Sequence, residues 1–173
     1  SASGVYPRQL PDHVTLKIVD GRIPSHGLVP KLIRKFGLEG RIQIIDRMLT
    51  VPELVEQYST ARVALVPSFF EGFGFPASEA MACGLSVIAN AAGALPEVVG
   101  TDGRSGRLVP QRNARAMADA MWAILRDPAE TERMGKAARE RVQRIFQWDQ
   151  AAAQLVEVFE EVIHASDRRS RAA

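Results

Sequence analysis

The chain has 173 residues, of which 46% are hydrophobic and 24% charged, a composition typical of one globular domain with a single core. Its formal net charge is only +2, which argues against the large basic surface of a nucleic-acid-binding protein, so we expect no nucleic-acid partner. Cys83 is the single cysteine, which excludes an intrachain disulfide. No apolar run approaches the ~18 residues of a membrane span.

Five short apolar runs predict buried β-strands. They are Val14–Val19, Ile42–Ile45, Val63–Val66, Ser86–Ala89 and Gly106–Val109. Helical patterns lie between them, at Val29–Phe36, Pro52–Ser59, Ala77–Ala82 and Leu95–Val99. Near-continuous apolar strands that alternate with helices indicate a parallel sheet covered on both faces. We therefore predict an α/β fold with a doubly wound, Rossmann-like parallel sheet.

After the last strand the pattern is helical only. Asn113 is a predicted N-cap, and the dipeptide Asp127-Pro128 ends one helix and begins the next. We expect one domain over residues 5–166 and a disordered basic tail over 167–173, because chain ends lose order unless they are tied down. A last helix from about Trp148 has its apolar residues on one stripe. They are Ala152, Leu155, Val156, Phe159, Val162 and Ile163. Three residues at helical spacing are predicted core residues, namely Met117, Met121 and Trp122.

The segment 67–84 contains the residues that indicate chemistry. A strand ends at Val66, a loop with Gly72 and Gly74 follows, and a helix begins near Pro76. Ligands of open parallel sheets bind at this edge, beyond the carboxyl ends of the strands. Glycines let the backbone approach a ligand or adopt positive φ. Free N–H groups at the helix start would form an anion site for a diphosphate without a metal ion. They belong to Phe75, Ala77 and Ser78.

Two carboxylates flank this turn. Glu71 lies at the strand end, and Glu79 is predicted to lie in the first turn of the helix. From the residues alone, a purely structural interpretation stands beside a functional one. Glu79 can serve only the helix dipole, and Glu71 can be an exposed loop residue. Ser68 and Ser78 have no histidine partner, so nucleophilic catalysis is not expected.

The complete string is more specific than its parts. Residues 67–84 read Pro-Ser-Phe-Phe-Glu-Gly-Phe-Gly-Phe-Pro-Ala-Ser-Glu-Ala-Met-Ala-Cys-Gly. This string resembles the donor-site motif of glycosyltransferase family 4. The resemblance spans roughly residues 14–163 and is most specific in 67–110. Other segments resemble later elements of that family: Ser86–Ala89, Gly93–Val99, Gly106–Pro110 and Phe146–Trp148. The resemblance implies the donor-binding, C-terminal domain of a retaining glycosyltransferase of GT-B type.

The resemblance also implies roles for individual residues. Glu71, in the catalytic site, would hydrogen-bond hydroxyls of the transferred sugar. Glu79 would bind the substrate by accepting hydrogen bonds from the ribose hydroxyls, a role that suits a carboxylate. Four backbone N–H groups would face the sugar and the diphosphate, those of Gly72, Phe73, Gly74 and Phe75. The nucleotide-diphosphate sugar is the donor substrate, and neither a cofactor nor a metal ion is implied.

The sequence departs from the family pattern in two ways. Asp20 and Asp46 stand at strand tips where the family has glycine, and carboxylates there weaken diphosphate binding unless Arg22, Arg47 or another cation pairs with them. The family's first strand, the Arg–Lys phosphate clamp and the acceptor domain have no counterpart here. We therefore expect a domain without its first strand, whose partner is an N-terminal domain or a second chain of the same enzyme, and which is inactive alone.

Three functions follow as hypotheses. The first is transfer of a hexose from a UDP- or GDP-sugar to a sugar, lipid or small-molecule acceptor, in the cytoplasm or at the inner face of the membrane. The second is another GT-B reaction, by a sugar-nucleotide epimerase or a phosphorylase. An epimerase would be expected to have carboxylates and histidines at other positions. A phosphorylase would need a lysine that binds a pyridoxal cofactor, and no such sequence context appears here. The third is a non-catalytic nucleotide-binding or interaction module, which Asp20 and Asp46 favour slightly.

Overall fold

The chain divides into two compact units, Ser1–Gln57 and Tyr58–Ala173. The structure, a computed structural model, describes residues 13–20, 23 and 27–171, with side chains up to residue 165. The expected domain start at residue 5 lies outside the described residues, as do residues 172 and 173 of the expected tail.

The first unit contains a parallel strand–helix–strand arrangement. Its elements are β1 (Leu16–Val19), α1 (Leu28–Lys35), β2 (Ile42–Ile45) and most of α2 (Val51–Ser59). Strand β1 begins two residues after the predicted Val14. The reason is that the Val14 carbonyl oxygen accepts hydrogen bonds from the Arg41 guanidinium, at 3.1 Å from Nε and 2.9 Å from Nη2, and does not join the ladder.

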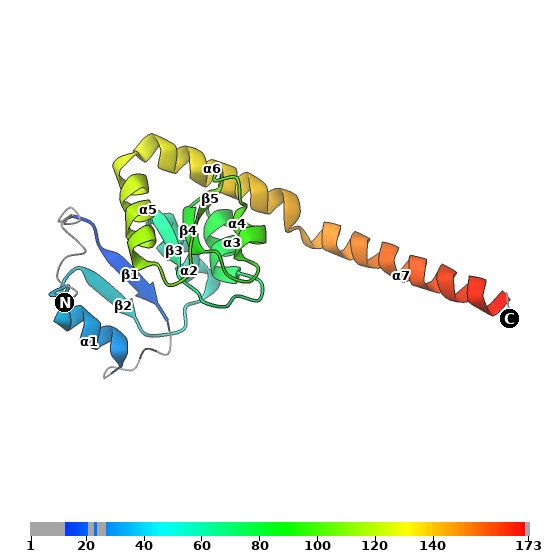
Figure 1. Cartoon of the computed structure of the whole chain (residues 1–173), viewed down its shortest axis with the longest axis horizontal. Coiled ribbons are helices and arrows are strands. Elements are labelled where there is room, and N and C mark those ends of the chain that lie inside the picture. Colours follow the sequence, from blue (N-terminus) through cyan, green and yellow to red (C-terminus); the bar gives the residue numbers. More distant parts are fainter. Residues whose placement is uncertain (1–12, 21–22, 24–26, 172–173) are drawn as a thin grey trace. The chain divides into compact units, whose positions relative to one another are not determined.

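The second unit contains a three-stranded parallel sheet in the order β3-β4-β5, with helices around it (Figure 1). The strands occur within one residue of their predicted bounds, and helix α4 matches its prediction. The elements are β3 (Val63–Val66), α3 (Phe75–Ala82), β4 (Ser86–Asn90), α4 (Leu95–Val99), β5 (Gly106–Val109), α5 (Ala114–Arg126), α6 (Pro128–Ile145) and α7 (Trp148–Arg171).

The five strands pair in parallel, as predicted, but they form two sheets and not one. Hydrogen bonds join β1 to β2, and β3 to β4 and β5. In a doubly wound sheet of order 3-2-1-4-5-6, the first strand is what joins the pair 2-3 to the set 4-5-6. The pair β1-β2 corresponds to strands 2 and 3 of that order, and the sheet β3-β4-β5 corresponds to strands 4, 5 and 6. Within each sheet the pairing follows the predicted doubly wound order.

Strand β4 forms the centre of the second unit, because it is buried along its whole length. Successive side chains of a strand point to opposite faces. Val87 and Ala89 accordingly belong to a hydrophobic cluster with α3 and α4. Ile88 belongs to a second cluster with Ile124 of α5 and Met134 of α6. Burial on both faces explains why this strand reads as a continuous apolar run.

Helices α5 and α6 both begin at side-chain caps, of which the sequence predicts the one at Asn113. The Asn113 side chain accepts a hydrogen bond from the Ala116 N–H at 2.9 Å. Asp127 ends α5 and accepts from the Glu130 N–H at 3.0 Å at the start of α6. The predicted core methionines pack against the second cluster, namely Met117 and Met121.

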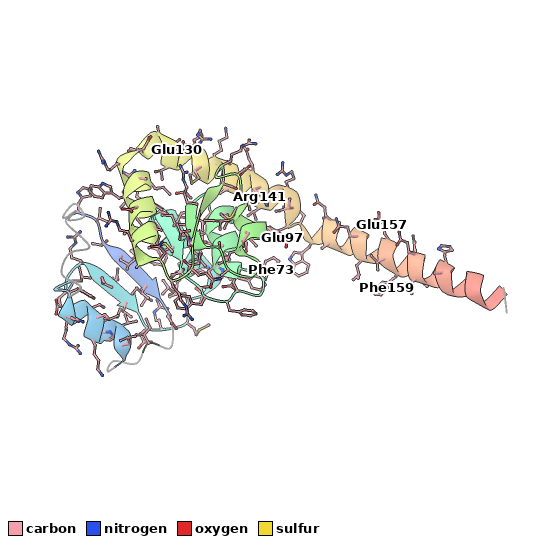
Figure 2. The ribbon with its side chains drawn as sticks, in the orientation of Figure 1. Phe73, Glu97, Glu130, Arg141, Glu157 and Phe159 are labelled. Atoms are coloured by element: carbon pink, nitrogen blue, oxygen red, sulfur yellow. The ribbon has the colours of Figure 1, made fainter. Side chains whose placement is uncertain are left out.

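Helix α7 exposes the apolar stripe that the sequence places on the last helix. Its large apolar side chains are each more than half exposed: Leu155, Val156, Phe159, Val162 and Ile163. Figure 2 labels Phe159 on this helix. The helix continues to Arg171, past the expected start of the tail at residue 167. Among the described residues, no helix has the length and apolar character needed to cross a membrane.

Helix α6 packs in direct backbone contact with the turn that follows α3. Gly135 is buried, and a Cβ atom built there would overlap the carbonyl oxygen of Gly84. Gly84 has a φ of +80° in that turn, so it cannot readily take a side chain either. The absence of a side chain at Gly135 therefore sets the distance between α6 and the sheet.

We predict that Gly135→Ala destabilises the second unit by about 1–3 kcal/mol, because the added methyl group must displace backbone atoms. Alanine is otherwise favoured over glycine inside a helix by about 0.5–1 kcal/mol, so a measured loss reports the contact. Chemical denaturation followed by circular dichroism measures it. Gly72→Ala is the control, since a Cβ there would meet nothing within 4 Å. Equal stability of the two variants would contradict this packing.

Candidate functional site

The loop between β3 and α3 lies at the carboxyl end of β3, where the sequence predicts a ligand site. Gly74 is the N-cap of α3 and has a φ of +98° and a ψ of +40°, in the left-handed region. A Cβ atom on Gly74 would also lie 3.2 Å from Leu95 Cδ2. Gly74 is therefore required by the fold itself. Gly72 is exposed with open space around its Cα, so the protein contacts do not require glycine there.

Backbone N–H groups of this loop are free to donate to a ligand. Within the described part of the chain, those of Gly72, Phe73, Gly74 and Phe75 donate to no protein acceptor. The prediction for Ser78 was wrong, because its N–H donates to the Gly74 carbonyl at 2.9 Å. The free donors precede an eight-residue helix whose dipole places partial positive charge at the same end.

The loop that follows β4 fixes the position of Glu71. The Ala94 N–H donates to the Glu71 carbonyl oxygen at 3.0 Å. Gly93 has a φ of +51°, and a Cβ atom there would overlap the same carbonyl oxygen. The two loops are thus in backbone contact at the carboxyl edge of the sheet.

Asn90, the last residue of β4, supports the first residues of the same loop. It is 5% exposed, and its Nδ2 donates to the carbonyl oxygens of Pro67 at 2.8 Å and Ser68 at 3.2 Å. The sequence analysis did not single it out. The available signal was an amide at the carboxyl end of an otherwise apolar strand.

Aromatic side chains attach the loop to α6. The Phe73 ring lies 4.7 Å from Phe75 and 5.4 Å from Phe146, the C-cap residue of α6, between ring centroids. Figure 2 shows Phe73 near the end of α6. The Phe69 ring lies 5.6 Å from the Arg112 guanidinium, whereas Phe70 is 85% exposed. Phe73 therefore contributes packing as well as a free backbone N–H group.

Arg141 of α6 fixes helix α4, which follows the Gly93 loop. Its Nη2 donates to the Glu97 carbonyl at 2.6 Å, and its Nε donates to the Val98 carbonyl at 2.9 Å. These bonds satisfy carbonyl groups at the end of a short helix that has few internal hydrogen bonds. Figure 2 labels Arg141 and Glu97 in this region.

The two candidate carboxylates have different surroundings. Glu71 is half-buried, and its carboxylate has no hydrogen-bond or salt-bridge partner among the described residues. Glu79 is exposed and lies in the second turn of α3, not the first, because the helix begins at Phe75. Its Oε2 accepts a hydrogen bond from the Tyr58 hydroxyl at 3.2 Å. Burial, and then the nearby Glu79 charge, raise the pKa of Tyr58, so its phenol stays protonated.

The strand-tip carboxylates lie in the first unit. Arg47, proposed as a partner for Asp46, instead pairs with Glu53 at 2.7 Å. Hydrogen bonds from Arg47 and Thr50 lower the pKa of Glu53 to about 2. Arg22, the other proposed partner, lies outside the described residues. The Asp20 backbone N–H donates to the β2 terminal carbonyl at 3.2 Å.

A cavity of about 310 Å³ lies at the other edge of the three-stranded sheet, near the amino ends of β3 and β4. Arg62, Ser86 and Thr131 are among the residues that line it. None of the candidate donor-site residues lines this cavity, so it is separate from the loop between β3 and α3.

Residues 8–141 match the sequence model of the family described as glycosyl transferases group 1. The chain belongs to this family. The match confirms the predicted family resemblance, and it includes the complete segment 67–84 on which that prediction depended. The parallel strands and surrounding helices agree with the predicted Rossmann-like domain of a GT-B protein.

Similar proteins in this glycosyltransferase family include two bacterial enzymes. The chain is 38% identical over 150 residues to the MMP alpha-(1->4)-mannosyltransferase of Mycolicibacterium hassiacum, covering 87% of this chain and 36% of that protein. It is 35% identical over 165 residues to the D-inositol 3-phosphate glycosyltransferase of Streptomyces bingchenggensis, covering 92% and 35% respectively. The chain thus spans about a third of the length of these relatives.

The fold is similar to a solved structure, sucrose-phosphate synthase from Thermosynechococcus elongatus. The TM-score is 0.77 at 36% sequence identity, and the match covers 87% of this chain and 39% of that one. This likeness agrees with the GT-B glycosyltransferase fold, although the chain matches only 39% of that structure.

The sequence analysis missed two residues that contact the segment 67–84, namely Tyr58 and Asn90. Both lie far from their partners along the chain, 21 residues for Tyr58 to Glu79 and 23 for Asn90 to Pro67. Only the packing of helices and strands reveals such pairs.

We predict that Asn90→Asp lowers the free energy of unfolding by about 1–3 kcal/mol, because two carbonyl groups lose their donor. Asn113→Asp is the matched control. Its side chain only accepts a hydrogen bond at an N-cap, where Asn and Asp are about equally good. Urea denaturation at neutral pH measures both changes. Equal effects of the two substitutions would show that the Asn90 donor is unimportant.

Proposed function

We propose that the whole protein is a retaining glycosyltransferase of family 4 that transfers a hexose from a nucleotide-diphosphate sugar, and that this chain binds the donor. One observation carries the proposal. In the part of the chain that the structure describes, the backbone N–H groups of residues 72–75 are free at the start of α3, between the unpaired Glu71 carboxylate and the exposed Glu79. Group 1 membership and the names of the similar proteins support it.

The diphosphate would bind at the start of α3. Backbone N–H groups and the helix dipole favour an anion there, so no metal ion is needed. Gly72 is exposed with open space beside it, which leaves room for a phosphate to approach the backbone. Asp20 and Asp46 are not part of this interaction in our proposal.

The sugar and the ribose would bind on either side of the diphosphate. Glu71, whose backbone is fixed by Ala94, would accept hydrogen bonds from hydroxyls of the transferred hexose. Glu79 would accept hydrogen bonds from the adjacent ribose hydroxyls. Transfer would proceed on the front face through an oxocarbenium-like state, with the leaving phosphate helping to remove the acceptor proton. Glu71 and Glu79 are then binding groups, not the acid and nucleophile of a glycosidase.

The acceptor differs among the similar proteins, whose names include a mannosyltransferase, an inositol 3-phosphate glycosyltransferase and a sucrose-phosphate synthase. We therefore leave the donor as a UDP- or GDP-sugar and the acceptor as a sugar, lipid or small molecule. Acceptor binding would come from an N-terminal domain or second chain. We further propose that the protein acts in the cytoplasm or at the inner face of the membrane.

A non-catalytic nucleotide-binding module is the second candidate. The Asp46 departure favours it, because Arg47, its neighbour in sequence, pairs with Glu53. Sugar transfer by the complete enzyme separates the two candidates. An enzyme that binds donor but never turns it over would support the module.

We predict that Glu71→Ala lowers sugar transfer by the complete enzyme by about 100-fold or more, because a contact to the reacting sugar is lost. Glu79→Ala is expected to raise the donor Kd by about 10- to 100-fold with little change in kcat, as expected for lost hydrogen bonds to a charged group. Steady-state kinetics measures both. Glu140→Ala, which removes an exposed carboxylate of α6, is the control. Full activity of Glu71→Ala would refute the assigned role.

We also predict that residues 1–173 alone bind nucleotide sugar weakly and transfer none, because acceptor and donor are not held together. Thermal denaturation with UDP- and GDP-sugars tests the binding, since a ligand at 100 times its Kd adds about 2.7 kcal/mol of stability. Adding an N-terminal domain is expected to restore turnover. Rapid transfer by the chain alone would overturn this prediction.

A further inference from the structure

Among the described residues, the Glu79 carboxylate has one hydrogen-bond partner. Its Oε2 accepts a hydrogen bond from the Tyr58 hydroxyl at 3.2 Å, and the Glu79 side chain is otherwise exposed on α3. The same hydroxyl lies 3.5 Å from the Pro76 carbonyl oxygen, farther than from the carboxylate. A carboxylate has two oxygens with about four acceptor sites. One bond to Oε2 therefore leaves Oε1, and part of Oε2, for two neighbouring hydroxyl groups of a ligand.

Tyr58 is itself held by the fold. It lies at the end of α2, is half-buried, and its ring packs against the hydrophobic cluster that contains α3 and one face of β4. Its backbone carbonyl accepts the Ala61 N–H at 3.1 Å. A tyrosine ring has only two side-chain torsions, so its hydroxyl occupies a defined position at low entropic cost. An ionised carboxylate cannot donate, so the protonated phenol is the donor of this pair.

We propose that Tyr58 is a positioning residue: it orients the Glu79 carboxylate toward the ribose, and so makes the site select ribonucleotide over deoxyribonucleotide donors. The inference rests on the proposed function, in which Glu79 accepts bonds from the ribose hydroxyls. An exposed glutamate loses side-chain entropy when it binds a ligand. The bond from Tyr58 restricts that freedom beforehand, and the benefit is realised only when both ribose hydroxyls are present.

The experiment is a calorimetric titration of the chain with UDP and GDP, and with their 2′-deoxy counterparts. It measures the Kd of each nucleotide. Tyr58→Phe keeps the ring and removes only the hydroxyl. We expect it to weaken ribonucleotide binding about three- to tenfold, less than the full loss of a charged hydrogen bond because the effect is indirect. Binding of the deoxynucleotide is expected to change less than twofold. In a Glu79→Ala background, Tyr58→Phe should have no further effect.

Three results would overturn the inference. The first is unchanged or tighter ribonucleotide binding by Tyr58→Phe, which would mean that the phenol competes with the ribose for Glu79. The second is an equal loss for both nucleotides, which would indicate a general structural role. The third is a full effect of Tyr58→Phe without Glu79. If the unsubstituted chain binds neither UDP nor GDP, or if Glu79→Ala leaves binding unchanged, the proposed function itself fails.

Discussion

The candidate site depends on the backbone contact between two loops at the carboxyl edge of the sheet. The Ala94 N–H donates to the Glu71 carbonyl, and Gly93 allows the approach because it has no side chain to overlap that oxygen. At the start of the loop, the Asn90 side chain donates hydrogen bonds to the carbonyl oxygens of Pro67 and Ser68. Among the described residues, no protein acceptor binds the N–H groups of residues 72–75, and free N–H groups are what an anion site requires.

The buried strand β4 makes that contact possible. Its five residues are buried, and its side chains enter a hydrophobic cluster on each face of the sheet. A strand packed on both faces is held firmly, so the loop that leaves its carboxyl end has a defined starting point. Close packing of α6 through Gly135, and the bonds from Arg141 to α4, support the same region from outside. Strand β4 thus contributes to the hydrophobic core through its apolar side chains and supports the candidate site through its carboxyl end.

The first unit contrasts with the second. Its two strands are largely exposed or half-exposed, and α1 has no buried residue. Arg47 forms an ion pair with Glu53 within this unit. The apolar side chains of α7 are likewise exposed. The matches cover only 36% and 35% of two similar proteins. Acceptor recognition in our proposal therefore depends on parts of the protein outside this sequence.

The sequence by itself determined the strand–helix alternation, the helix cap at Asn113, the helix break at Asp127-Pro128 and the motif around Glu71, since each depends on neighbouring residues and local periodicity. It did not determine the division into two sheets, the exact start of α3 that moves Glu79 into the second turn, or the exposure of α7. It also missed Tyr58 and Asn90, whose partners are 21 and 23 residues away. Only the tertiary structure decides such pairs, because a hydrogen bond between distant residues depends on how complete helices and strands pack.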